Sequence, residues 1–141
     1  LVLETVRHLK NIALFHADFL CVRDQVDLCS RLVAALARLE ESDGWFTKVF
    51  RMLANLRPTV SIDPSTGSPT VTLDAKVAAD PMTLDTILNA LLSQTKRRRI
   101  CVFLDEFQDI LDIDEVIILL YLLLSVFLAI VIKSSALTPF G

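Results

Sequence analysis

The sequence contains little glycine or proline, with three glycines and five prolines among 141 residues. This scarcity excludes a collagen-like chain and a low-complexity linker. Hydrophobic residues make up 53% of the sequence and charged residues 22%, which excludes an intrinsically disordered chain. The length is that of one domain with a sizeable core. The composition therefore predicts a folded domain or a membrane-inserted one.

Cysteine and histidine are also few and widely spaced. Cys21, Cys29 and Cys101 are odd in number and form no CxxC pair, which argues against a disulfide framework and indicates a reducing compartment. His8 and His16 have no cysteine or carboxylate at the spacing of metal ligands. We therefore expect no zinc-type site.

The chain has no excess of positive charge, since its formal net charge is -3. A nucleic-acid partner is not indicated, since phosphate binding needs a concentrated basic surface. The one basic run, residues 96–99 (KRRR), is interpreted as the last turn of a helix, where cations face exposed carbonyls. The alternative for this run is contact with a polyanion.

Hydrophobic periodicity predicts alternating helices and strands. Short apolar runs indicate buried parallel strands, the first of them buried on both faces, whereas apolar residues at helical spacing indicate amphipathic helices. The predicted helices cover residues 1–10, 25–41, 45–55 and 82–95, and the predicted strands cover residues 12–19 and 100–104. This alternation predicts an α/β fold with a parallel sheet and right-handed crossovers.

A different pattern interrupts this series at residues 59–74. Residues 59–63 (TVSID) and 70–74 (TVTLD) alternate in type and flank the turn-rich segment PSTGSP. Such a pattern is typical of a β-hairpin. We therefore expect a hairpin inserted into a single domain that spans residues 1–141.

Paired carboxylates end the apolar segment ICVFLDEFQD, residues 100–109. Asp105 and Glu106 would lie at the carboxyl end of a strand, where ligands bind in open α/β sheets. One carboxylate can hold magnesium through water while the other orients an attacking water. The alternative is that the two acids only begin a loop or cap a helix. For Asp18, which ends the first strand, the alternative is helix capping.

The segment hhhhDEFQ, in which h is an apolar residue, resembles the Walker B strand of P-loop ATPases of the AAA+ and signal-transduction group, particularly archaeal-type members. The resemblance extends over most of residues 1–110. IALFHADF resembles the family's strand that ends in an aspartate, and VDLCSRLVAAL resembles the helix after it. LRPTVSIDPSTGSPTVTLD resembles a hairpin insertion found in these ATPases.

The resemblance implies an ATP- and Mg²⁺-dependent hydrolase. By this resemblance Asp105 would hold Mg²⁺ through water, Glu106 would be the catalytic residue that polarises water, and Gln108 would face the nucleotide or a neighbouring element. Phe107 is expected in the core. Ser134 or Ser135 would match the small polar residue that senses the γ-phosphate.

The phosphate-binding loop, GxxxxGK[ST], does not occur in the sequence, because the three glycines, Gly44, Gly67 and Gly141, do not precede a lysine at the required spacing. The family would place this loop just before Leu1. We therefore expect a partial P-loop domain that is truncated after its Walker A loop and is inactive alone.

Residues 116–132 form a charge-free apolar segment of seventeen residues. As a helix it would reach roughly 25 Å, less than a typical bilayer core. The favoured interpretation divides it into a buried helix, residues 115–124, and a strand, residues 126–132. The alternative is a membrane span that would anchor the protein, which we otherwise expect in the cytoplasm.

Three hypotheses follow from the sequence: an ATPase domain, a non-catalytic interaction module and a tail-anchored membrane protein. The first binds nucleotide, and either of the first two would act through a protein partner or self-association. The sequence does not name that partner.

Overall fold

The computed structural model describes residues 4–5, 8, 11–39, 51, 53–67, 69–113, 120 and 123–131. In chain order the elements are β1 (Ile12–Asp18), α2 (Gln25–Arg38), η1 (Ala54–Leu56), β2 (Thr59–Ile62), β3 (Pro69–Thr72), α4 (Ala75–Ala78), α5 (Pro81–Gln94), β4 (Arg99–Asp105) and η2 (Phe107–Asp112). Residues 120 and 123–131 are also helical. The order of helices and strands confirms the predicted α/β class.

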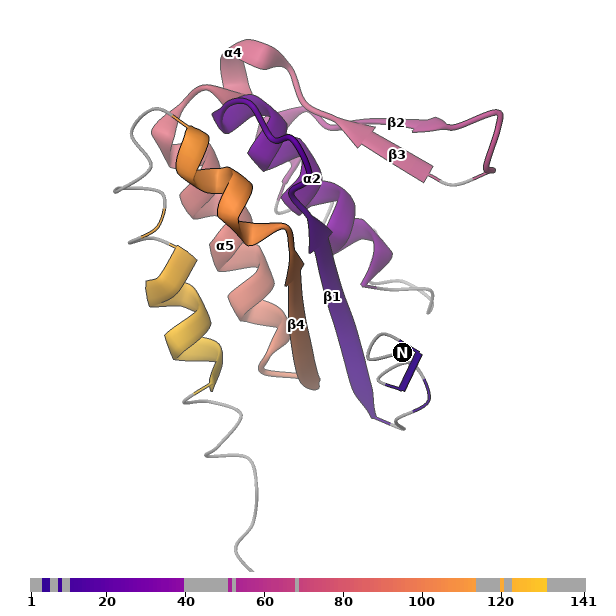
Figure 1. The fold of residues 1–141 in the computed structure, drawn as a ribbon, viewed down its shortest axis with the longest axis vertical. Coiled ribbons are helices and arrows are strands. Elements are labelled where there is room, and N and C mark those ends of the chain that lie inside the picture. Colours follow the sequence, from indigo (N-terminus) through magenta and orange to yellow (C-terminus); the bar gives the residue numbers. More distant parts are fainter. Residues whose placement is uncertain are drawn as a thin grey trace, which may run out of the picture.

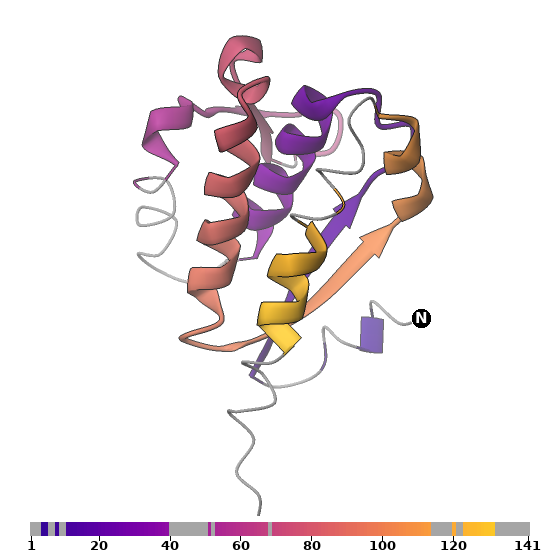
Figure 2. The same ribbon diagram turned by 90° about the vertical axis from the view of Figure 1, so that its left-hand side faces the viewer.

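Strands β1 and β4 pair in parallel, from Ile12 opposite Arg99 to Asp18 opposite Asp105. The predicted parallel sheet is therefore present, as a two-stranded sheet within the described residues. Figures 1 and 2 show α2, α5 and helix 123–131 on the same face of this sheet. Among the described residues, these helices thus form one layer against the sheet of β1 and β4.

The core lies between this sheet and the helices. Phe15 and Ala17 of β1 are 1% exposed, and they meet the fully buried apolar stripes of α2 and α5. Residues on the opposite sheet face, such as His16 and Phe103, are half-buried. The prediction that residues 12–19 are buried on both faces is therefore confirmed for the face that the described helices cover, while the other face is half-buried.

Local signals set the starts of both long helices. Asp24 accepts a 2.8 Å hydrogen bond from the Asp27 N–H and caps α2. Asp80 accepts a 2.9 Å bond from the Met82 N–H and caps α5, whose first residue is Pro81. Proline suits this position because its missing N–H would have no partner there. These contacts confirm the predicted helix starts.

The hairpin is also confirmed. Strands β2 and β3 pair antiparallel, with Thr59 opposite Thr72 and Ile62 opposite Pro69. In the connecting turn, Asp63 accepts a 2.8 Å bond from the Ser65 N–H, and Gly67 has a φ of 68°. The hydrogen bonds from Ser65 lower the pKa of the Asp63 carboxyl. The buried Val71 and Leu73 fix the hairpin to the core.

Two predictions about the second half of the chain need correction. Residues 126–131 are helical, not a strand, because Leu123, Phe127 and Ile130 recur at helical spacing and pack on the core. The basic run follows α5 instead of forming its last turn, since α5 ends at Gln94. It still lies at the helix end, where the Arg97 N–H donates to the Gln94 carbonyl at 3.1 Å.

Several predictions lie largely outside the described residues: the helix over residues 1–10, the helix over residues 45–55 and part of the apolar segment 116–132. Ser134 and Ser135 lie outside them entirely. Ala54–Leu56, at the end of the second of these predicted helices, is a 3-10 turn. Within the part of the chain that the structure describes, no helix has the length and apolar character needed to cross a bilayer.

Candidate functional site

The parallel register brings two aspartates to the same edge of the sheet. Asp18 ends β1 and Asp105 ends β4, and the two are paired residues. Neighbouring strands are about 4.8 Å apart, so the two acids stand side by side. The Asp18 side chain was predicted to lie at a strand end, and its place next to Asp105 follows from the pairing.

Glu106 adopts a left-handed backbone conformation, with φ 51° and ψ 37°. This conformation is unfavourable for a residue with a Cβ atom and is tolerated where the surrounding structure enforces it. It ends β4 and begins η2 in one step. The chain therefore turns at Glu106, as predicted, and Glu106 is exposed at the sheet edge.

The side chains around this turn contact one another. Asp105 Oδ1 accepts a 3.1 Å hydrogen bond from the Glu106 N–H, and Glu106 Oε2 accepts a hydrogen bond from Gln108 Nε2. The predicted site residues Asp105, Glu106 and Gln108 are thus brought together. Gln108 lies on the solvent-exposed side of η2, next to the carboxylate that it contacts.

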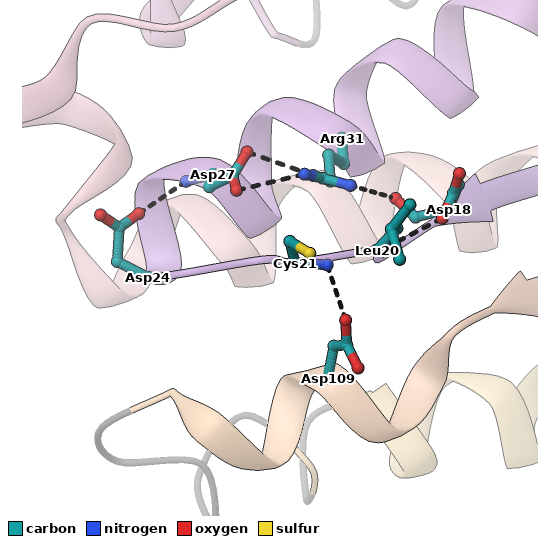
Figure 3. A network of polar contacts seen from close by, with 7 residues as sticks. All are labelled: Asp18, Leu20, Cys21, Asp24, Asp27, Arg31 and Asp109. Atoms are coloured by element: carbon teal, nitrogen blue, oxygen red, sulfur yellow. Dashed lines mark hydrogen bonds and ion pairs between the residues drawn. The ribbon is translucent and has the colours of Figure 1, made fainter.

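Asp109 joins the turn after β4 to the loop after β1. Its Oδ2 accepts a 2.6 Å hydrogen bond from the Cys21 N–H, as Figure 3 shows. Cys21 also has a left-handed φ of 55°. No role was predicted for Asp109 from the sequence. The one feature that could have marked it as a site residue is its position four residues after Asp105.

Asp18 is held by its own loop and by α2. Its Oδ1 accepts a 2.9 Å bond from the Leu20 N–H, and its carbonyl accepts a 2.9 Å bond from Arg31. Arg31 in turn forms a 3.2 Å ion pair with Asp27 (Figure 3). The Asp18 carboxylate therefore shapes the loop after β1. It does not cap a helix, since Asp24 is the N-cap of α2.

Phe107, the first residue of η2, packs inward next to this edge. Its ring centroid is 6.3 Å from that of Phe19, and the ring packs against the core. The Phe19 N–H donates to the Asp105 carbonyl at 3.0 Å, which extends the β1 and β4 pairing into the loops. Phe107 is thus half-buried and packs against the core, as its predicted place among core residues requires in part.

The donors at this edge are oxygens, which are the ligands that Mg²⁺ prefers. Within the described ranges, no group of three or more His, Cys, Asp or Glu residues could hold a metal ion. Mg²⁺ in nucleotide sites is commonly bound by one or two carboxylates together with phosphates and water. Asp105 fits that arrangement, since its Oδ2 accepts no hydrogen bond from the described residues.

Comparison with protein-family models, with curated proteins and with solved structures gave no significant match.

Proposed function

We propose that this edge of the sheet is the magnesium- and water-binding half of an ATP-hydrolysing site in a partial P-loop domain. The observation that carries the proposal is the position of Asp105 and Glu106. One ends a parallel strand beside Asp18, and the other occupies the left-handed turn that exposes its carboxylate. Strand ends of this kind are where α/β sheets bind ligands.

In this proposal the two carboxylates have separate roles. Asp105 would hold Mg²⁺ through water, using Oδ2, which accepts no hydrogen bond from the residues that the structure describes. The ion, when bound, neutralises charge on the phosphates. Glu106 accepts a proton from the attacking water as the oxygen of that water bonds to the γ-phosphorus and the bond to the leaving ADP oxygen breaks.

The neighbouring residues position these two carboxylates. Gln108 contacts Glu106 Oε2 and limits its rotation. The Asp109 contact with the Cys21 N–H fixes the loop after β1 against η2. Ser134 and Ser135 remain proposed γ-phosphate sensors on the family resemblance alone.

Phosphate binding requires a loop of backbone amides with a lysine, and no such motif occurs among the 141 residues. Most of the neutralisation of phosphate charge comes from that loop. The 141 residues alone should therefore bind ATP weakly and hydrolyse it little.

The test is ATP binding, measured with a fluorescent ATP analogue, by the 141-residue chain and by the gene product extended upstream of Leu1. We expect tight, magnesium-dependent binding by the extended protein, which Asp105→Asn weakens and Asp112→Asn leaves unchanged. Asp112 is a suitable control because it is an exposed acid of the same 3-10 helix. The proposal would be refuted if the extended protein binds ATP with the same affinity when magnesium is removed and when Asp105 is replaced by asparagine.

A non-catalytic interaction module is the second candidate. It is favoured by the use of the Asp18, Glu106 and Asp109 carboxylates in contacts within the chain. In that case the acids act as loop supports. The extended protein would then bind no nucleotide, whereas the folded state would still depend on Asp109.

A further inference from the structure

Helix 123–131 buries one side and exposes an apolar stripe on the other. Leu123 is fully buried and Ile130 is 3% exposed, and both belong to the core. Leu124, Leu128 and Val131 are 59%, 61% and 60% exposed. Their spacing of four and three residues places them along one line of the helix. This apolar stripe is an aliphatic surface that the described chain leaves in solvent.

The basic run, residues 96–99, lies at the amino ends of the strands. Lys96, Arg97 and Arg99 are exposed, and within the described part of the chain none of them forms an ion pair. Arg98 is half-buried. The positive charge of Lys96, Arg97 and Arg99 is thus exposed to an external partner.

This charge is distant from the acids of the candidate site. The seven residues of β4 run from Arg99 to Asp105, a length of about 20 Å at 3.3 Å per residue. Screening in physiological salt reduces interactions between exposed charges beyond about 8 Å. The basic end therefore acts as a local cationic surface although the chain as a whole is acidic.

The stripe and the basic run lie at the same end of the molecule. Both views in Figures 1 and 2 place the carboxyl end of helix 123–131 near the turn that joins α5 to β4. That turn contains Lys96 and Arg97. An aliphatic stripe therefore runs toward a cluster of exposed cations.

We propose that the apolar stripe and the basic run together dock on an anionic phospholipid surface. Peripheral membrane binding combines buried apolar area with attraction of cations to anionic headgroups. The stripe consists of Leu124, Leu128 and Val131, and leucine and valine are under-represented among the residues that dominate protein interfaces. The combination of these side chains with the basic run favours lipid over a protein partner.

Docking of this kind leaves the candidate nucleotide site at the other end of β4 facing away from the membrane. The inference does not rest on the proposed ATPase function, because neither the stripe nor the basic run contributes a residue to that site. A failure of one proposal is therefore distinguishable from a failure of the other.

The test is co-sedimentation of the 141-residue chain with vesicles of phosphatidylcholine, with or without phosphatidylserine. We expect binding to the anionic vesicles that decreases as salt is raised. Lys96→Gln with Arg97→Gln should weaken binding by about fivefold per cation, or roughly 25-fold together. Arg23→Gln with Lys76→Gln is the matched control, since both residues are exposed cations outside the basic run, and it should retain binding.

Vesicle binding of the double variant Leu124→Ser with Leu128→Ser tests the stripe. The comparison variant is Met82→Ser, because Met82 is 65% exposed and lies at the start of α5. Far-UV circular dichroism identifies any variant that fails to fold, in which case the charge variants decide alone. Equal binding to both kinds of vesicle, or none, would overturn the inference. So would a dimer in solution that the stripe variant dissociates without any vesicle binding.

Discussion

Asp109 and Cys21 are 88 residues apart in the sequence, yet the Asp109 carboxylate accepts a 2.6 Å hydrogen bond from the Cys21 N–H. The contact joins the segments that follow the two paired strands. The carboxyl edge of the sheet is therefore held as one unit by side-chain and backbone contacts. A site at this edge depends on Asp109 even if Asp109 touches no ligand.

We predict that Asp109→Ala lowers the free energy of unfolding by about 1 kcal/mol, because it removes a hydrogen bond to a charged acceptor and leaves the Cys21 N–H without that partner. Urea denaturation measures the change. Asp112→Ala is the control, since it removes an exposed acid of the same helix. Equal effects of the two substitutions would show that the contact with Cys21 contributes nothing.

The left-handed conformation of Glu106 supplies a second prediction. Glycine adopts this conformation without the penalty that a Cβ atom brings. Glu106→Gly should therefore be more stable than Glu106→Ala by about 1 kcal/mol in urea denaturation. Both variants lack the carboxylate, so their difference isolates the backbone conformation. If the glycine variant is the less stable of the two, the turn does not carry this strain.

Burial makes Cys29 the least reactive of the three thiols. It is fully buried in α2, and desolvation raises the pKa of its thiol from 9.0 to about 12. Cys21 is exposed and Cys101 is half-buried. With iodoacetamide at pH 8, we expect modification of Cys21 first and of Cys29 only after denaturation, as followed by mass spectrometry. Early modification of Cys29 in the folded protein would contradict this packing.

The same shift has a consequence for stability in alkali. The Cys29 pKa is higher in the folded chain than in the unfolded chain, so the unfolded chain loses this proton first as pH rises. The stability due to the protonated thiol is complete below about pH 9 and decreases toward pH 12. Replacing Cys29 with alanine should remove this part of the pH dependence, as urea denaturation at successive pH values would show.

Much of the fold could be predicted from local signals. Asp24, Asp80 and Pro81 start the two long helices where the capping rules place them. The alternating residues and the turn around Gly67 likewise predicted the hairpin. These features depend on residues close together in the sequence, which is why a single sequence is enough to find them.

Predictions that depended on tertiary packing were less successful. The segment beginning at Val126 has the β-branched and aromatic residues of a strand, yet Leu123 and Ile130 bury a helical face there. The contact of Asp109 with Cys21 could not be found from spacing, because the pairing of β1 with β4 creates it. The same pairing places Asp18 beside Asp105, while the positions of Asp105 and Glu106 at a strand end were predictable from the apolar run before them.

We propose that Glu106 activates water for ATP hydrolysis. Single-turnover hydrolysis of ATP by the protein extended upstream of Leu1, with ATP affinity measured in parallel, measures this role. We predict that Glu106→Gln reduces the hydrolysis rate by roughly a hundredfold or more, since general-base catalysis contributes 10²–10⁴-fold. The ATP affinity of Glu106→Gln should stay unchanged, and so should the hydrolysis rate of the control variant Asp112→Asn. An unchanged hydrolysis rate in Glu106→Gln would show that the Glu106 carboxylate does not activate water.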